Sequence, residues 1–367
     1  MKEGWTYKKL GEVCNLYQPR TISTKEMVAD GKYNVFGANG IIGKYNEYNH
    51  EYPEILMTCR GATCGNINIS TPKAWINGNA MVIHIVNEKE LTKDYLVHAL
   101  TNIDKSHIIT GAAQPQITRQ TLSPLEIPLP PLSEQQRIVK QLDEAFAEID
   151  TIKAAAEKQL SEAKTLFQKA LSKAMTPKEG WEEKTLGEVT IFSQGIQVDV
   201  NLQTELYSPG KVRFLRIIDV TQGNMPPRYI DDPGEKYHLK ENEIAMVRYG
   251  TVGYVCYGYE GVIANNLFKI TIKDKSKLQS NYLQYFLKSN LFQSHIRKGV
   301  GGAALPAIKF GDIKNVQLCL PPLSDQQRIV EELDELAENV KEIEKLNNKL
   351  TAECDAMKQA LLRQVFE

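Results

Sequence analysis

Polar side chains that can form paired hydrogen bonds are concentrated in loops, among glycine, proline and tyrosine residues. Arginine can form two hydrogen bonds with guanine, and glutamine or asparagine can do so with adenine, whereas lysine and tyrosine suit phosphate groups. In the first half of the chain these candidate DNA contacts are Gln18, Arg20, Asn39, Lys44, Tyr45, Arg60, Thr63, Gln114, Gln116 and Arg119. In the second half they are Gln194, Gln197, Arg213, Arg216, Arg228, Tyr229, Arg248, Tyr249 and Thr251. Each alone is more often a solvated loop residue, so only the set predicts DNA binding.

Motifs for catalysis are missing from the sequence. Gly43-Lys44 is followed by Tyr45 rather than by the serine or threonine of a phosphate-binding loop. The six histidines form no HxxxH or HxH pair, the six cysteines form no CxxC pair, and no GxSxG motif is present. The spacing of residues in the sequence does not exclude Ser-His-Asp catalysis by residues from distant parts of the chain. We therefore expect a binding protein without an active site, a metal site or a cofactor of its own.

The chain contains an internal repeat, and this repeat determines its organisation. Lys2 to Trp5 and Leu10 to Val13 recur as Lys178 to Trp181 and Leu186 to Val189. The ten residues from 130 to 139 recur almost unchanged from 321 to 330. A period this long means that each copy is a domain rather than one unit of a solenoid. Two such domains predict a particle with pseudo-two-fold organisation.

A long helix is predicted after each copy, over residues 133–174 and 324–367. Apolar residues recur every three or four positions in both segments, with no internal proline or glycine. Ser133 with Gln136, and Ser324 with Gln327, have the spacing of helix N-caps. We expect the two helices to pair as an antiparallel coiled coil, the alternative being an ordinary amphipathic pair that closes two cores.

Residues 1–132 and 175–323 are predicted to be two similar mixed α/β domains, so the fold class is α+β. In the second domain Phe268, Ile270 and Ile272 alternate with polar residues, as in a strand with one buried face. A short helix is expected next, at 282–287, and its counterpart lies at 95–100 in the first domain. Two target-contacting domains joined by two long helices is therefore the predicted architecture.

Composition is that of an ordinary globular protein, with 367 residues, 42% hydrophobic and 24% charged. No apolar run approaches the ~20 residues that a membrane-spanning helix needs, and no apolar leader follows Met1. We expect a cytoplasmic protein with no membrane partner and with reduced thiols. Charge is mildly positive in the two predicted domains and negative in the last segment, which weakly favours DNA on the domains and protein on the helices.

The repeated motifs resemble a known family over almost the whole chain. Gly-Trp and Leu-Gly-Glu-Val open each half, and Pro-Leu-Pro-Pro-Leu-Ser-Glu-Gln-Gln-Arg-Ile at 128–138 has its copy at 320–329. These blocks are similar to the specificity (S) subunit of Type I restriction-modification enzymes. The resemblance implies that each mixed domain recognises one half of a split double-stranded DNA target. It also implies that the coiled coil docks two methyltransferase subunits, which hold S-adenosylmethionine and methylate adenine, while separate restriction/translocase subunits use ATP and Mg²⁺.

The two copies differ most between Thr190 and Glu243, where the second copy is longer, and at Gln114 against Leu305 and Gln116 against Ala307. Different residues at equivalent positions predict an asymmetric target, with half-site centres about one helical turn, ~10 base pairs, apart. Two alternatives remain. One is a degenerate nuclease or methyltransferase, and the other is a coiled-coil scaffold without nucleic acid.

Overall fold

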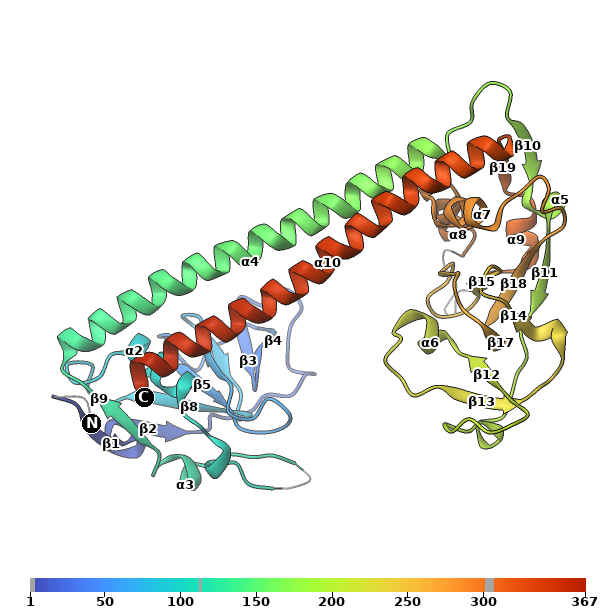
Figure 1. Cartoon of the computed structure of the whole chain (residues 1–367). Coiled ribbons are helices and arrows are strands. Elements are labelled where there is room, and N and C mark those ends of the chain that lie inside the picture. Colours follow the sequence, from blue (N-terminus) through green and yellow to red (C-terminus); the bar gives the residue numbers. More distant parts are fainter. Residues whose placement is uncertain (1–3, 112–113, 301–306) are drawn as a thin grey trace. The chain divides into compact units, whose positions relative to one another are not determined.

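The computed structural model describes residues 4–111, 114–300 and 307–367. It divides into two compact units, residues 1–156 with 348–367 and residues 157–347. Both boundaries between the units fall inside the long helices α4 (Leu132–Ala174) and α10 (Leu323–Phe366) (Figure 1). Each unit therefore contains one globular copy and one half of the helix pair.

The first copy contains two small sheets and a terminal strand pair. The terminal pair is antiparallel, β1 (Thr6–Lys9) with β9 (Glu126–Leu129). One sheet has the order β2 (Cys14–Tyr17), β8 (Ala80–Ile85), β5 (Ile55–Thr58) and β6 (Ile67–Ile69). The other has the order β4 (Gly40–Tyr45), β3 (Tyr33–Gly37) and β7 (Trp75–Ile76). The helices are α1 (Leu10–Val13), α2 (Lys93–Asn102), α3 (Arg119–Leu122) and the 3₁₀ turn η1 (Ser106–Ile108).

The second copy repeats this plan with longer connections. Its terminal pair is β10 (Glu182–Thr185) with β19 (Gln317–Leu320). One sheet has the order β11 (Thr190–Gln194), β18 (Leu267–Ile272), β15 (Ile244–Val247) and β16 (Val255–Cys256). The other has the order β13 (Arg228–Asp231), β12 (Lys211–Leu215), β17 (Gly261–Ile263) and β14 (His238–Leu239). The helices are α5 (Leu186–Val189), α6 (Ile217–Thr221), α7 (Ser280–Lys288), α8 (Asn290–Val300) and α9 (Phe310–Lys314), with 3₁₀ turns η2 (Val200–Leu202) and η3 (Glu235–Tyr237).

Matching strand pairings confirm that the copies share one fold. The parallel pair β3 and β7 corresponds to β12 and β17, and the alternation predicted in β18 is present, with Phe268, Ile270 and Ile272 buried. The main difference lies after the first strand of the sheet that contains the parallel pair. Ala38 and Asn39 make a tight connection between β3 and β4, whereas α6 and a further loop separate β12 from β13. The predicted α+β class is confirmed, and this longer connection, residues 216–227, lies inside the segment 190–243 where the two sequences differ most.

Each long helix contributes to the hydrophobic core of the copy beside it. In the first unit Ile138, Leu142 and Leu362 pack into the same buried cluster as Tyr95 and Ile83. In the second unit Leu171 and Leu333 occupy the corresponding places, with Tyr282 and Phe268. Removal of these side chains from water anchors the helices far more strongly than helix propensity alone could.

Ion pairs between α4 and α10 show that the helices run antiparallel. In the first unit Lys358 Nζ lies 2.6 Å from Asp150 Oδ1, and Lys153 Nζ lies 3.1 Å from Asp355 Oδ1. In the second unit Lys164 Nζ lies 2.7 Å from Glu344 Oε1. The predicted antiparallel coiled coil is confirmed. Several apolar residues of the two helices remain in solvent, however, including Ile152 at 51% and Met357 at 55% exposure, because two helices alone cannot cover every apolar position.

The repeated proline-to-glutamine motif begins each long helix in a way that differs from the prediction. Ser133 and Ser324 are not the N-caps, because the helices begin one residue earlier. The carbonyl oxygen of Pro131 accepts a hydrogen bond from Gln135 N at 3.0 Å, and that of Pro322 accepts one from Gln326 N at 3.0 Å. The serine N-cap prediction is therefore wrong, and the prolines provide the first helical acceptors.

Gln135 and Gln326 form buried hydrogen bonds that join each long helix to the globular copy beside it. These two residues are hereafter called the latch. The Gln135 side chain donates to the carbonyl oxygens of Glu90 and Pro130 at 2.8 and 2.9 Å, and its Oε1 accepts from Thr92 N at 2.9 Å. Gln326 makes equivalent bonds with Lys277, Pro321 and Gln279. Both side chains are completely buried. The latch therefore satisfies backbone groups that would otherwise be buried without a hydrogen-bond partner.

Among the residues that the structure describes, no helix is both long and apolar enough to span a membrane. All six cysteines are free thiols, and four of them are buried.

Candidate nucleic-acid interface

Four loops of the first copy meet at one edge of its sheets. Arg60 and Gln116 are paired by an antiparallel β-bridge, and Gly61 N donates to the carbonyl oxygen of Pro115 at 3.0 Å. The Arg60 and Gln116 side chains are exposed. Residues 56 positions apart in the sequence are thus held together by backbone hydrogen bonds, which leaves their side chains available to a ligand.

Asn39 and Gln18 join this edge through two further contacts. Asn66 Nδ2 lies 3.4 Å from Asn39 Oδ1, so the β3–β4 connection lies beside the turn that follows β5. Gln18 Nε2 donates to the carbonyl oxygen of Gly78 at 2.8 Å. Gln18, Asn39, Arg60 and Gln116, together with Gln114 and Thr63 on the same loops, are hereafter called the first polar surface. All six are exposed.

The remaining predicted residues of the first copy are exposed or structural. Lys44 and Tyr45 lie at the end of β4 opposite Asn39, and the Tyr45 ring packs edge-on against Trp75 with centroids 5.3 Å apart. Arg20 is exposed, and Arg119 is the exposed first residue of α3. The structure does not bring Lys44 and Tyr45 into the first polar surface. For Lys44, the predicted contact with a phosphate group is therefore untouched by this arrangement.

The second copy gathers polar groups at the equivalent edge. Gln194 Nε2 lies 3.4 Å from the carbonyl oxygen of Asn265, whose own Nδ2 lies 3.2 Å from Gln197 Oε1. Tyr249 is paired with Ala307 by a β-bridge, and Thr251 is exposed in the same turn. Gln194, Gln197, Tyr249 and Thr251 are hereafter called the second polar surface.

Backbone hydrogen bonds establish which residues of the two surfaces correspond. Cys59 N donates to Asn79 O, and Cys59 O accepts from Ile117 N at 2.9 Å. Arg248 makes the same pair of bonds, with Asn266 O and Ile308 N. Arg248 is therefore equivalent to Cys59, a buried thiol whose pKa burial raises to about 11. Arg60 is consequently equivalent to Tyr249. Leu305, the predicted counterpart of Gln114, lies outside the described residues.

The Arg248 side chain is tied into the protein. Its Nε donates to the carbonyl oxygen of Ile308 at 3.0 Å, and its guanidinium lies over the rings of Tyr249 and Phe310, 5.0 and 5.9 Å from their centroids. Arg248 is half-buried, whereas Arg60 is exposed. The two arginines therefore differ in the freedom with which they can approach a base.

Three other predicted residues of the second copy already have protein partners. Arg228 Nη2 lies 2.8 Å from Glu205 Oε1, and the Tyr229 ring packs edge-on against Tyr207. Arg216 forms a bidentate pair with Asp219. Burial raises the pKa of the Asp219 carboxyl, but the hydrogen bonds from Arg216 outweigh it, so the net pKa lies below its usual value. Arg213 is exposed on β12, directly opposite Tyr229 on β13.

Sequence reasoning missed the asparagines that join the loops. Asn66 in the first copy is exposed and Asn265 in the second is half-buried, and each is hydrogen-bonded to a predicted residue. Gln222 and Asn224, exposed in the connection after α6, were missed as well. Their position inside the most divergent segment, 190–243, was the available signal.

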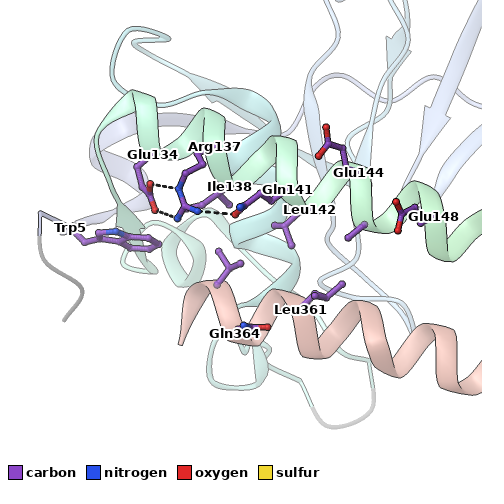
Figure 2. A pocket seen from close by; sticks show the side chains of 12 residues that line it. Trp5, Glu134, Arg137, Ile138, Gln141, Leu142, Glu144, Glu148, Leu361 and Gln364 are labelled. Atoms are coloured by element: carbon purple, nitrogen blue, oxygen red, sulfur yellow. Dashed lines mark hydrogen bonds and ion pairs between the residues drawn. The ribbon is translucent and has the colours of Figure 1, made fainter.

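A groove of about 610 Å³ lies between α4 and α10 in the first unit. Trp5, Ile138, Ala145, Leu361 and Val365 are among its apolar lining residues. Arg137 lies along its polar rim, where it pairs with Glu134 at 2.6 Å and with Gln141 at 2.9 Å (Figure 2). An apolar floor with a charged rim is the pattern of a protein-docking surface.

Several proteins named as type I restriction enzyme specificity subunits are similar to this chain over most of its length. A putative type I restriction enzyme specificity subunit of Haemophilus influenzae is 27% identical over 351 residues, covering 89% of this chain and 86% of the relative. The EcoBI specificity subunit of Escherichia coli is 24% identical, covering 86% and 73%. A solved chain from a type I restriction-modification system covers 100% of this chain and 98% of its own length, with a TM-score of 0.76 and 20% identity.

A family model described as the type I restriction modification DNA specificity domain matches residues 2–162 and 178–352. The two matches contain the two copies with their polar surfaces, and together they cover far more than half of the sequence. The chain therefore belongs to the type I restriction-modification DNA specificity family, as a specificity subunit that carries the DNA recognition domain twice.

Proposed function

We propose that the first and second polar surfaces recognise the two different halves of one split, asymmetric double-stranded DNA target. The observation that carries this proposal is that equivalent positions of one fold have different chemistry. Arg60 is replaced by Tyr249, and Gln116 by Ala307. A guanidinium and an amide suit guanine and adenine, whereas tyrosine and alanine offer stacking or apolar contact. The two halves of the target should therefore differ in sequence.

In this proposal residues 1–132 and 175–323 are the recognition domains, and the helices at 133–174 and 324–367 separate them and dock partners. Half-site centres are expected about one helical turn, ~10 base pairs, apart. Exposed Lys44, Arg20 and Arg119 are assigned to phosphate groups, because they lie on the same copy as the first polar surface without belonging to its edge.

The partners proposed for the helices are two methyltransferase subunits and, through them, restriction/translocase subunits. The groove lined by Ile138, Ala145 and Leu361 supports this assignment, as does the exposure of Ile152 and Met357 on the helices. S-adenosylmethionine, ATP and Mg²⁺ are proposed to bind in these partner subunits rather than in this chain.

The test is co-expression with the methyltransferase from the same host, followed by single-molecule sequencing of N6-methyladenine in the host DNA. A modified motif with two specified parts and an unspecified spacer is the expected result. A stable complex with no modified motif would favour the scaffold alternative. Nuclease or methyltransferase activity of the purified chain alone would favour a degenerate enzyme.

Arg60→Ala is expected to weaken recognition of the first half-site only. Loss of a bidentate contact with guanine costs ~1–3 kcal/mol at that base, and the second half-site keeps all its contacts. The measurement is affinity for duplexes with single base changes at each position. Equal loss on every sequence would contradict base recognition and assign Arg60 to phosphate. Arg60→Lys is the matched control that retains the charge.

Arg248→Ala is expected to weaken the second half-site by another route. The substitution removes the bond to Ile308 and the stacking on Phe310, so the loop beside Tyr249 loses its support. Discrimination should fall across several bases of that half-site, by ~1–2 kcal/mol in total. Loss confined to a single guanine would instead show that Arg248 contacts the base directly.

A further inference from the structure

The connection from β12 to β13 in the second copy is a separate, braced loop. Arg216, its first residue, donates from Nε and Nη2 to the two carboxylate oxygens of Asp219, both at 2.8 Å. The same Nη2 donates to the carbonyl oxygen of Pro226 at 2.9 Å. One guanidinium therefore connects the start of the loop, its helix α6 and its end.

Two further features stiffen this loop. Tyr259 Oη donates to the carbonyl oxygen of Val220 at 3.2 Å, which fixes the end of α6. Gly223 ends the helix in the left-handed region, with φ of 68°, and its backbone N lies 3.3 Å from the carbonyl oxygen of Ile218. The Asp219 side chain is only 1% exposed, so the ion pair is shielded from water. A loop braced in this way loses little conformational entropy when it binds.

Polar groups at the tip of the loop have no assigned partner. Gln222 and Asn224 are exposed, and within the part of the chain that the structure describes no hydrogen bond of either side chain is found. The adjacent Asp219 and Pro226, by contrast, are both hydrogen-bonded to Arg216. The rigid base of this loop therefore presents two free amides.

The loop lies at the same edge as the second polar surface. Leu215, just before Arg216, accepts a hydrogen bond from Ala264 N at 2.9 Å, and Ala264 is followed by Asn265 of that edge. Ile217 Cδ1 lies 3.8 Å from the position that a Cβ on Gly250 would take, between Tyr249 and Thr251. Figure 1 shows α6, β12 and β13 far from the α7 side of the second unit. In the first copy the equivalent connection places Asn39 beside the turn that carries Arg60.

We propose that Gln222 and Asn224 are specificity-determining residues that recognise adenine in the second half-site, and that Arg216 is the positioning residue that holds their loop. The proposal rests on the proposed function and extends it to this loop. An amide forms two hydrogen bonds with N6 and N7 of adenine in the major groove. Arg216 is thereby moved from the DNA contacts predicted from sequence to a supporting role.

Gln222→Ala and Asn224→Ala test the amides in the complex with methyltransferase subunits. Each substitution is expected to reduce the preference for adenine at one position of the second half-site by about tenfold, with the first half-site unchanged. The measurement is competition binding on a library of duplexes randomised within the motif. Asn242→Ala is the matched control, because Asn242 is exposed before the opposite end of β15 and should leave the motif intact.

A base analogue shows whether the amide contacts adenine itself. Replacing the adenine with 7-deazaadenine removes the N7 acceptor, so the affinity of the wild-type complex for the duplex should fall about tenfold. The affinity of the matching alanine variant should fall little further. Additive losses from the variant and the analogue would overturn direct contact. An unchanged motif in both alanine variants would overturn the proposal. If the wild-type complex shows no split motif, the proposed function fails instead.

Arg216→Ala, Arg216→Lys and Asp219→Asn test the positioning role. All three should reduce preference at the positions that Gln222 and Asn224 recognise, because none can keep the bidentate pair and the bond to Pro226. A phosphate contact would behave differently. Lysine would then restore binding, Asp219→Asn would have no effect, and the loss would be uniform across sequences. That result would overturn the positioning role of Arg216. The alanine variants of Gln222 and Asn224 would still test the contact of the amides with adenine.

Discussion

Replacing Gln135 with leucine is expected to lower the free energy of unfolding by about 3 kcal/mol. Gln135 is completely buried, and its amide satisfies Glu90 O, Pro130 O and Thr92 N at 2.8 to 2.9 Å. Leucine has a similar size but leaves these backbone groups without partners inside the protein. Urea unfolding, followed by circular dichroism, measures the loss.

The neighbouring Gln136→Leu is the matched control, because Gln136 is exposed in the same helical turn. The free energy of unfolding of the Gln136→Leu variant should change by less than about 0.5 kcal/mol. Gln326→Leu should reproduce the Gln135→Leu loss in the second unit, where the bonds to Lys277, Pro321 and Gln279 are equivalent. If the two latch variants are as stable as the control, the motif has another role, such as contact with a partner.

Ala145→Arg is expected to weaken methyltransferase capture roughly 30-fold or more. Ala145 lines the groove between α4 and α10, and a long charged side chain there would fill the space and oppose burial of an apolar partner surface. The measurement is calorimetric titration of the purified methyltransferase into each variant.

Ala147→Arg makes the same change on an exposed position of the same helix, outside the groove lining. It should bind methyltransferase as wild type does, and unfolding curves of both variants should match. Unchanged affinity of Ala145→Arg would show that the groove does not receive the partner. The proposed DNA recognition by the two polar surfaces does not depend on this result.

The residues that stabilise each copy and those proposed to recognise DNA lie on different parts of it. The latch residues Gln135 and Gln326 are buried where the long helix begins. Arg60 and Gln116, by contrast, are exposed, and backbone bonds hold their loops together. Because backbone bonds do not depend on the side chain, the residues proposed to contact bases can change while the fold persists. This separation explains how one fold can present Arg60 in one copy and Tyr249 in the other.

The sequence by itself determined the duplication, the two long helices and the class of the chain. Each follows from a local or repeated pattern. Apolar spacing of three and four without proline or glycine identifies the helices, and alternation at Phe268, Ile270 and Ile272 identifies a strand. The near-identity of 130–139 and 321–330 identifies both the repeat and the family. Patterns of this kind are visible in the sequence because neighbouring residues carry them.

Only the tertiary structure decided which polar residues lie together and what each one does. Arg60 meets Gln116, and Arg248 is tied to Ile308, through contacts between loops about 60 residues apart. The glutamine of the repeated motif is a latch, and Arg216 is engaged by Asp219, because burial and a nearby acceptor determine a side chain's role. Residue type and spacing cannot specify these roles, since the partners are often backbone carbonyl groups that every residue possesses.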